Sequence, residues 1–200
     1  MGQKRMQGLV WGKDGAYFRA NKDNGQTDVM SMLKALVSQP GVPADLSLLH
    51  TAPVSLPRER FTHIGKLPPS EWSALLLASR FVIGVGQPVY GPTALEALRH
   101  GCVFINPIFD RPVPARMGVD FKSQHEYLRQ LESAPLAEGG AYVCSYRQGD
   151  AVALGKCVAR AVSGEGLAPW LPSPYTRDGF RATFGDVVRG FVDAANARAA

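Results

Sequence analysis

Short apolar runs alternate along this chain with longer stretches in which apolar residues recur every three or four positions. The short runs predict strands, and the longer stretches predict helices with one buried face. The predicted strands cover residues 9–11, 46–50, 61–64, 81–84, 103–105 and 141–145. The predicted helices cover residues 29–38, 71–79, 93–100, 123–132, 150–162 and 177–199, the last in one piece or two.

Several of these helices carry boundary signals. Asp28 is a good N-cap for the first helix, and Ser70 is expected to cap the second. Pro92 suits the first turn of the third helix, and Gly101 suits its C-terminal end. The polar stretch 19–27 is predicted to be a loop.

Alternation of strands and helices in units of about 30 residues predicts an α/β fold, a Rossmann-like parallel sheet with helices on both faces. The strands are short and apolar without polar alternation, which is typical of strands buried on both sides. In such folds the ligand lies beyond the carboxyl ends of the strands. We therefore expect a site at the turns after residues 11, 50, 64, 84 and 105, within a single domain of residues 1–200.

Composition supports an ordinary globular domain, with 46% hydrophobic and 20% charged residues in a chain of 200. No apolar run reaches about 18 residues, so no transmembrane helix is predicted. The N-terminus has no apolar core of a signal peptide, and Met6 breaks the myristoylation motif. The net charge is +5, but the basic residues are scattered, so we expect no nucleic-acid partner.

The sequence does not decide whether its three cysteines are free or disulfide-bonded. They are Cys102, Cys144 and Cys157. An odd count without CxxC spacing argues against a zinc site and against a disulfide framework. Cys102 and Cys144 lie in apolar surroundings and are expected to be buried. One pair forms a bridge if the protein matures in an oxidising compartment.

The stretch 81–110, FVIGVGQPVYGPTALEALRHGCVFINPIFD, carries the candidate chemistry. A loop that delivers a helix N-terminus beside a buried strand is suited to a phosphate, and Gly91, Pro92 and Thr93 form such a start. Glu96, one turn on, is either a ligand for sugar hydroxyls or a solvent-facing helix residue. Gly84 and Gly86 lack the dinucleotide pattern, so they equally suit a plain turn. The stretch indicates a nucleotide or nucleotide-sugar ligand.

The segment GPTALEALRHGCVFINPIF resembles the GPAPLEAxxxGCxFLNPxF stretch of glycosyltransferase family 18, the β-1,6-N-acetylglucosaminyltransferases of N-glycan synthesis. Residues 81–86 are similar to that family's FVGLGFP strand and turn, and the resemblance runs over nearly the whole chain. It implies the C-terminal, donor-binding half of a two-domain GT-B glycosyltransferase, whose N-terminal half is absent here. The implied donor is UDP-GlcNAc, and the implied acceptor is a mannose of an N-glycan on a glycoprotein.

The resemblance also implies roles for individual residues. Glu96 binds the ribose hydroxyls, and residues 91–93, at the start of the predicted helix 93–100, hold the diphosphate. Gly86 lies in the turn beside them, and Asn106 lies near the donor sugar. Lys13 either neutralises phosphate charge on the leaving UDP or is an exposed loop lysine. The turn 65–67 reads the base through its backbone. The family's reaction inverts the anomeric carbon with no metal and no further cofactor, and its members lie in the Golgi through an anchor that this chain lacks.

The sequence departs from the family at two positions and leaves the catalytic base unassigned. Tyr90 stands where the family has glutamate, and Ile108 stands where it has lysine. An inverting transferase needs a general base for the acceptor hydroxyl, and in this family the other half supplies it. The four histidines, His50, His63, His100 and His125, are candidates by type only. A non-catalytic nucleotide-sugar-binding module and a flavodoxin-like hydrolase are the alternative interpretations.

Overall fold

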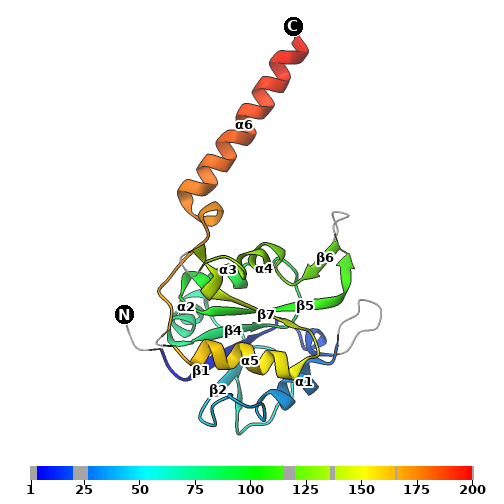
Figure 1. Ribbon diagram of the computed structural model, residues 1–200, viewed down its shortest axis with the longest axis vertical. Helices are drawn as coiled ribbons and strands as arrows, with labels where there is room; N and C mark the ends of the chain where they lie inside the picture. The colour runs from blue at the N-terminus through cyan, green and yellow to red at the C-terminus, as the bar shows by residue number, and fades with distance from the viewer. Residues whose placement is uncertain (1–3, 20–26, 115–119, 136–137, 165, 200) are drawn as a thin grey trace. The chain divides into compact units, whose positions relative to one another are not determined.

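The computed structural model describes residues 4–19, 27–114, 120–135, 138–164 and 166–199 (Figure 1). Most of the predicted 19–27 loop lies outside these residues. The chain divides into two compact units, residues 1–170 and residues 171–200. The first unit holds every strand and all but one of the α-helices of the described chain. The prediction of a single domain over 1–200 stays a prediction.

Strands and helices alternate through the first unit, as the hydrophobic pattern predicts. The strands are β1 (Gln7–Trp11), β2 (Ser47–His50), β3 (Phe61–His63), β4 (Phe81–Gly84), β5 (Val103–Pro114), β6 (Asp120–Ser123) and β7 (Val143–Arg147). The α-helices are α1 (Val29–Leu36), α2 (Pro69–Ala78), α3 (Thr93–Arg99), α4 (Glu126–Leu131) and α5 (Ala151–Val162). Short 3-10 helices are η1 (Gly15–Phe18) and η3 (Gly140–Tyr142).

The sheet has the strand order β3-β2-β1-β4-β5-β6, and β7 also pairs with β5. All pairs are parallel except β5 with β6, which is antiparallel. The predicted α/β fold, Rossmann-like with a mostly parallel sheet, is therefore confirmed. The antiparallel extension was not predicted: β5 was expected to end at Ile105, but it continues to Pro114 and turns back as β6.

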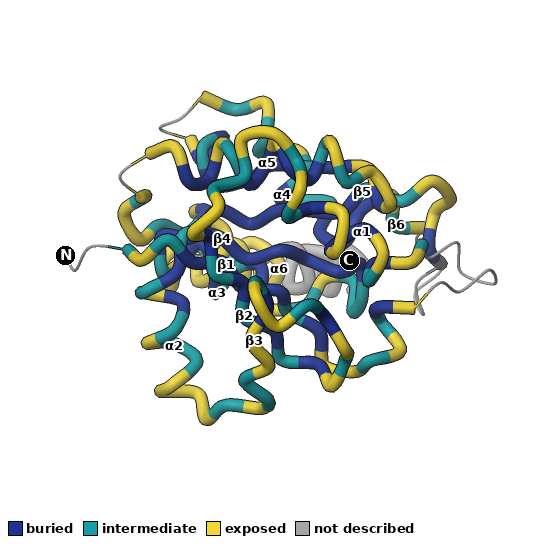
Figure 2. The backbone as a smooth tube through the Cα atoms, turned by 90° about the horizontal axis from the view of Figure 1, so that it is seen from below, coloured by how far each residue is buried: buried dark blue, intermediate teal, exposed yellow. Residues whose placement is uncertain are grey.

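Helices cover both faces of the sheet (Figure 1). One core cluster joins α1 and α5 to one face through residues such as Leu33, Ile83 and Leu154. The other cluster joins α2, α3 and α4 to the opposite face through Leu76, Leu98 and Leu128. The central strands are dark along their length in Figure 2, which colours the chain by burial. Strands buried on both faces explain why their sequences lack polar alternation.

Helix boundaries follow local chemistry where the signals are strong and shift where they are weak. Asp28 caps α1 by accepting a 3.1 Å hydrogen bond from the Ser31 amide. The Ser70 cap was wrong: α2 begins at Pro69, because consecutive prolines already have the backbone φ of a first helical turn. The predicted fourth helix starts later than expected, since Ser123 belongs to β6 and His125 is the cap of α4.

Lys4 ties the C-terminal ends of α2 and α3 together. Its ammonium donates to the Ser79 carbonyl at 2.6 Å and to the His100 carbonyl at 2.9 Å. Cations are favourable at helix C-termini, where carbonyls lack intrahelical partners. Burial lowers the pKa of Lys4, and the neighbouring Cys102 acts in the opposite direction. The two helices that border the candidate site are thus fixed to each other at their far ends.

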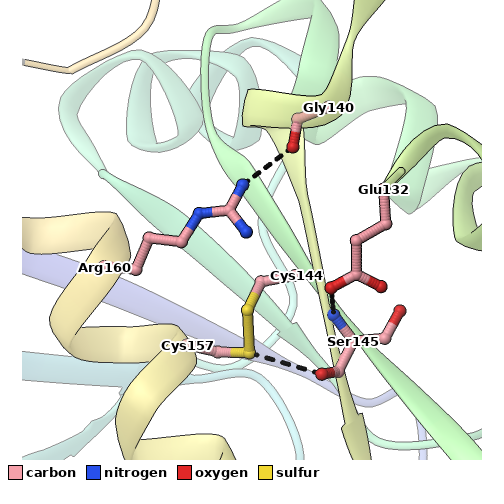
Figure 3. Close-up of a disulfide and its surroundings, with 6 residues drawn as sticks. All are labelled: Glu132, Gly140, Cys144, Ser145, Cys157 and Arg160. Atoms are coloured by element: carbon pink, nitrogen blue, oxygen red, sulfur yellow. Dashed lines mark hydrogen bonds between the residues drawn. A yellow bond between two sulfur atoms is a disulfide. The ribbon is translucent and has the colours of Figure 1, made fainter. Parts of the chain in front are cut away.

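A disulfide joins Cys144 of β7 to Cys157 of α5 (Figure 3). It settles the open question of the cysteines, and Cys102 is free and buried. Hydrogen bonds flank the bridge: Glu132 accepts from the Ser145 amide at 2.7 Å, and Arg160 donates to the Gly140 carbonyl at 2.7 Å. Disulfides form and persist in oxidising compartments.

The second unit consists of η4 (Ser173–Tyr175) and α6 (Arg177–Ala199). The predicted C-terminal helix is therefore one helix and not two. Thr176 accepts a 3.1 Å hydrogen bond from the Gly179 amide at its start. Among the helices of the described residues, none combines the length and apolarity needed to cross a bilayer.

Candidate functional site

A cavity of about 510 Å³ opens at the carboxyl edge of the sheet. It lies where β1, β2 and β3 end and where α2 and α3 begin. Its lining residues are Trp11, Gly12, Lys13, Thr51, Lys66, Leu67, Pro69, Trp72, Pro92, Thr93 and Glu96. This is the edge at which open α/β folds bind ligands. Four of the predicted site residues, Lys13, Pro92, Thr93 and Glu96, meet here.

Glu96 is held in the cavity by a tryptophan. The Trp72 indole N–H donates a 3.0 Å hydrogen bond from α2 to Glu96 Oε2 on α3. Both side chains are half-buried, so the bond is partly shielded from water. One carboxylate oxygen is thereby oriented, while the lone pairs on the other stay available for hydroxyl donors. The alternative of a freely solvated helix glutamate does not describe this arrangement.

Thr51 joins the loops that follow β1 and β2. Its hydroxyl donates to the Gly12 carbonyl at 2.9 Å and lies 3.2 Å from the Gly12 amide nitrogen. Gly12 is also packed tightly, because a Cβ there would lie 2.3 Å from the Phe18 ring. These contacts fix the residue directly before Lys13 and so set where the lysine leaves the backbone.

The cavity carries two cations, Lys13 and Lys66, on separate loops. Both are exposed, and neither has an ion-pair partner among the described residues. Glu96 is the one carboxylate among the residues that line the cavity. A cavity with two free ammonium groups and a single oriented carboxylate suits a ligand that combines an anionic group with neighbouring hydroxyls.

The loop from Gly84 to Tyr90 is braced by side chains from other elements. Gln124 accepts from the Gly86 amide at 3.0 Å and donates to the Pro88 carbonyl at 3.3 Å. Two further donors, Tyr146 to the Gly84 carbonyl and Gln148 to the Val85 carbonyl, lie at 3.0 and 3.2 Å. Gly86 has φ 94°, which explains the glycine. Its amide is committed to Gln124, so the structure does not turn Gly86 toward the cavity.

Two other predicted site residues lie outside the cavity. Gly91 lines a hollow of about 10 Å³ between Trp11 and His125. Asn106 is fully buried. Its amide pairs with the His125 backbone, accepting at 3.1 Å and donating at 3.3 Å. Asn106 therefore anchors the start of α4, and its contact with a donor sugar stays a prediction.

The two departures from the family lie on different elements. Tyr90 follows the braced loop with φ 57°, a left-handed conformation uncommon outside glycine. Its amide donates to the Gln124 carbonyl at 2.8 Å, and its ring stacks on His125 with centroids 4.5 Å apart. Ile108 lies within β5, paired with Ser123 and Arg147. Neither residue lines the cavity.

The histidines have structural contacts in the folded chain. His100 ends α3, with Nδ1 2.7 Å from the Glu96 carbonyl oxygen. His125 caps α4, since its Nδ1 accepts from the Leu128 amide at 3.4 Å. Burial lowers the pKa of His125 to about 4, so its ring is neutral near neutral pH. His50 and His63 lie together at the ends of β2 and β3.

Acid should destabilise the fold through His125. A histidine with a lowered folded-state pKa contributes stability above its unfolded pKa, and that stability is lost as pH falls from about 6.5 toward about 4. The His125→Asn variant keeps a capping acceptor. Between about pH 7 and about pH 5, we expect its free energy of unfolding to fall by about 1–2 kcal/mol less than that of the parent. Chemical denaturation at both pH values measures this difference. Equal losses in both proteins would contradict the assignment.

Sequence reasoning missed several residues that line the cavity, among them Trp11, Thr51 and Trp72. Trp11 and Thr51 had a positional signal, because each ends or follows a strand at the predicted ligand edge. Trp72 had none, since its register relative to Glu96 depends on how α2 packs beside α3. Lys66 was predicted only as part of the 65–67 turn, and its side chain was not singled out.

The family model of glycosyltransferase family 18 matches residues 1–189 of the chain. The chain belongs to glycosyltransferase family 18. The match covers the cavity and every residue that lines it, so the family 18 interpretation drawn from residues 91–109 is confirmed at the level of the family.

This chain aligns with only a part of each named relative in the family. An alpha-1,6-mannosylglycoprotein 6-beta-N-acetylglucosaminyltransferase of Caenorhabditis elegans is 32% identical over 159 residues, which are 78% of this chain and 23% of that protein. The human enzymes A and B of the same name are 30% and 28% identical, over 58% of this chain and 16% and 15% of their own lengths. The chain thus spans less than a quarter of the relatives it matches.

Proposed function

We propose that this family 18 chain binds UDP-GlcNAc as the C-terminal donor half of a GT-B β-1,6-N-acetylglucosaminyltransferase. The acceptor in this proposal is a mannose of an N-glycan on a glycoprotein, and the compartment is the Golgi. The observation that carries the proposal is the cavity in which an oriented Glu96 lies together with Lys13 and Lys66. The disulfide between Cys144 and Cys157 is compatible with a secretory compartment.

The ribose, the diphosphate and the base each have a matching group in the cavity. A carboxylate with one oxygen held by Trp72 can accept both hydrogens of a vicinal diol, which suits the ribose. Lys13 and Lys66 supply positive charge for the diphosphate, with Pro92 and Thr93 beside it at the start of α3. Gly91, which precedes them outside the cavity, is proposed to let the backbone approach the diphosphate. The turn 65–67 then lies by the base. Indole faces of Trp11 and Trp72 offer apolar surface to the nucleoside.

Catalysis in this proposal is divided between two halves. Charge builds on the UDP leaving group as the glycosidic bond breaks, and ammonium groups placed at that charge stabilise the transition state. Lys13 is the best-placed residue for this role, because Thr51 fixes its loop. No histidine is among the residues that line the cavity. The general base for the acceptor hydroxyl is therefore assigned to the other half of a GT-B enzyme.

A second candidate function is nucleotide-sugar binding without transfer. It is favoured by the same lining, because Glu96 is bonded to Trp72 and no other carboxylate or imidazole faces the cavity. Transfer of N-acetylglucosamine to a mannose acceptor by this 200-residue chain would exclude this second candidate.

Calorimetric titration with UDP and with UDP-GlcNAc tests the proposal. We expect saturable binding of both, without added metal, because the lysines supply the charge that a metal gives to other nucleotide sites. UMP should bind at least about tenfold more weakly, since it lacks the second phosphate. Absence of binding by all three nucleotides would overturn the donor assignment.

A further inference from the structure

A second cavity, of about 620 Å³, lies beyond the ends of β2 and β3. The residues that line it come from these two strands and from the loop between them. They are His50, Pro53, Val54, Ser55, Leu56, Arg58, Phe61, Thr62 and His63. None of them lines the donor cavity, and the proposed function uses none of them. Since β3 is the edge strand of the sheet, this cavity lies at the side of the fold.

None of the polar groups that line this second cavity is acidic. Arg58 is exposed and has no ion-pair or hydrogen-bond partner within the described chain. Two imidazoles and the hydroxyls of Ser55 and Thr62 complete the polar lining, and no carboxylate is among the lining residues. Such a set offers donors and positive charge without a competing internal anion.

His50 is the buried member of this set, with 2% of its surface exposed. Its Nδ1 lies 2.9 Å from the Ala52 carbonyl oxygen. A carbonyl only accepts, so Nδ1 carries the proton and Nε2 is left for a ligand. Nε2 has no hydrogen-bond partner among the described residues. The ring is therefore held in one tautomer by its own loop, with its second nitrogen uncommitted.

His63 lies directly beside His50 on the neighbouring strand. The two residues are register partners, and their rings stack with centroids 5.1 Å apart and planes 29° apart. Burial, and to a lesser degree the charge of His63, lower the pKa of His50, while the bond to Ala52 acts in the opposite direction. Two stacked imidazolium rings repel each other, and a bound anion removes that repulsion.

We propose that the cavity beyond β2 and β3 is a second binding site, specific for an oxyanion such as a carboxylate or phosphate group on a small solute. Arg58 supplies the permanent charge, and the rings of His50 and His63 supply N–H donors beside it. A bound anion also favours the protonated form of His50. The titratable and charged groups of the cavity are these three residues, from β2, β3 and the loop between them. Binding is therefore coupled to proton uptake and strengthens as pH falls.

The test follows the ring signals of His50 and His63 by NMR during titration with inorganic phosphate and, separately, with acetate. Sodium chloride at matched ionic strength is the control for general screening. We expect saturable shifts at about pH 6. Acetate has the same charge at both pH values, so its binding should be at least about fivefold weaker at about pH 8. Tighter binding of phosphate or of acetate then identifies the anion.

Variants separate this site from the donor cavity. Arg58→Gln should weaken binding by about tenfold or more, since it removes the permanent charge. Arg5→Gln, which changes an exposed arginine before β1, should leave binding unchanged, and so should Lys13→Gln in the donor cavity. His63→Gln, at an exposed position, should weaken binding, because it removes the ring that stacks on His50.

Two results would overturn the proposal. One is the absence of saturable shifts of His50 and His63 with either anion at about pH 6. The other is equal affinity in the parent and in Arg58→Gln. UDP titration of Arg58→Gln reports on the donor cavity independently, so failure of one site does not decide the other.

Discussion

Replacing Glu96 with glutamine should lower the affinity of the chain for UDP by about 10–100-fold, the value of losing a hydrogen bond to a charged group. The carboxylate lies in the cavity at the carboxyl edge of the sheet, with one oxygen held by Trp72. An amide in its place has one acceptor oxygen, and its NH₂ group faces either the indole N–H or the ribose hydroxyls. Calorimetry with the parent and the variant measures the loss.

Matched variants distinguish a contact of Glu96 with the ribose from a general effect of charge. Glu138→Gln removes the same charge from an exposed position and should leave UDP affinity unchanged. Trp72→Phe keeps an aromatic ring but removes the N–H that orients Glu96. We therefore expect its free energy of UDP binding to weaken by about 1 kcal/mol, less than in Glu96→Gln. In the parent, 2′-deoxy-UDP should bind more weakly than UDP, and this preference should disappear in Glu96→Gln. If the variant still preferred UDP over 2′-deoxy-UDP, a contact between Glu96 and the ribose would be excluded.

Replacing Cys144 and Cys157 together with alanine should lower the free energy of unfolding by about 3 kcal/mol. The bridge joins β7 to α5 across a sequence separation of 13 residues, and its loss frees the unfolded chain. For a unit of this size the change corresponds to a fall in Tm of about 6–12 °C. Thermal unfolding followed by circular dichroism gives the measurement.

Reduction provides the control for the disulfide prediction. A reducing agent should lower the Tm of the parent toward that of the double variant and should leave the Tm of the variant unchanged. Cys102 is free in both proteins, so its reactions do not distinguish them. A parent whose Tm does not respond to reductant would contradict the stabilising role of the bridge.

The fold was predictable from the sequence where a single segment decides its own structure. The central strand β4 and the first residues of β5 are short apolar runs, and Asp28 and Gly101 mark helix ends by chemistry that acts within one turn. The extension of β5 and its return as β6 were not predictable in this way. Polar and proline-containing residues after Asn106 carry no strand pattern, so their pairing depends on the partner strand.

The site was predictable in part for the same reason. Lys13, Thr93 and Glu96 follow strands or begin a helix at the expected edge, so topology alone brings them together. The Trp72 bond to Glu96 depends instead on the packing of two helices 24 residues apart in sequence. Gly86 and Asn106 were assigned through the family motif, and both have partners inside the protein. Residue types in a motif do not distinguish a ligand contact from a support.

The braced loop of residues 84–90 bears on how this chain tolerates change. Gln124, Gln148 and Tyr146 hold it through its backbone amides and carbonyls, not through its side chains. A side-chain change at position 90 therefore leaves these supports in place, whereas a Cβ at Gly84 or Gly86 would lie 2.1 Å from Gln124 or 2.7 Å from Gln148. This independence offers a route by which a tyrosine could replace the family's glutamate at position 90 without displacing the helix that carries Glu96. Position 90 can therefore change while the cavity that contains Glu96 keeps its shape.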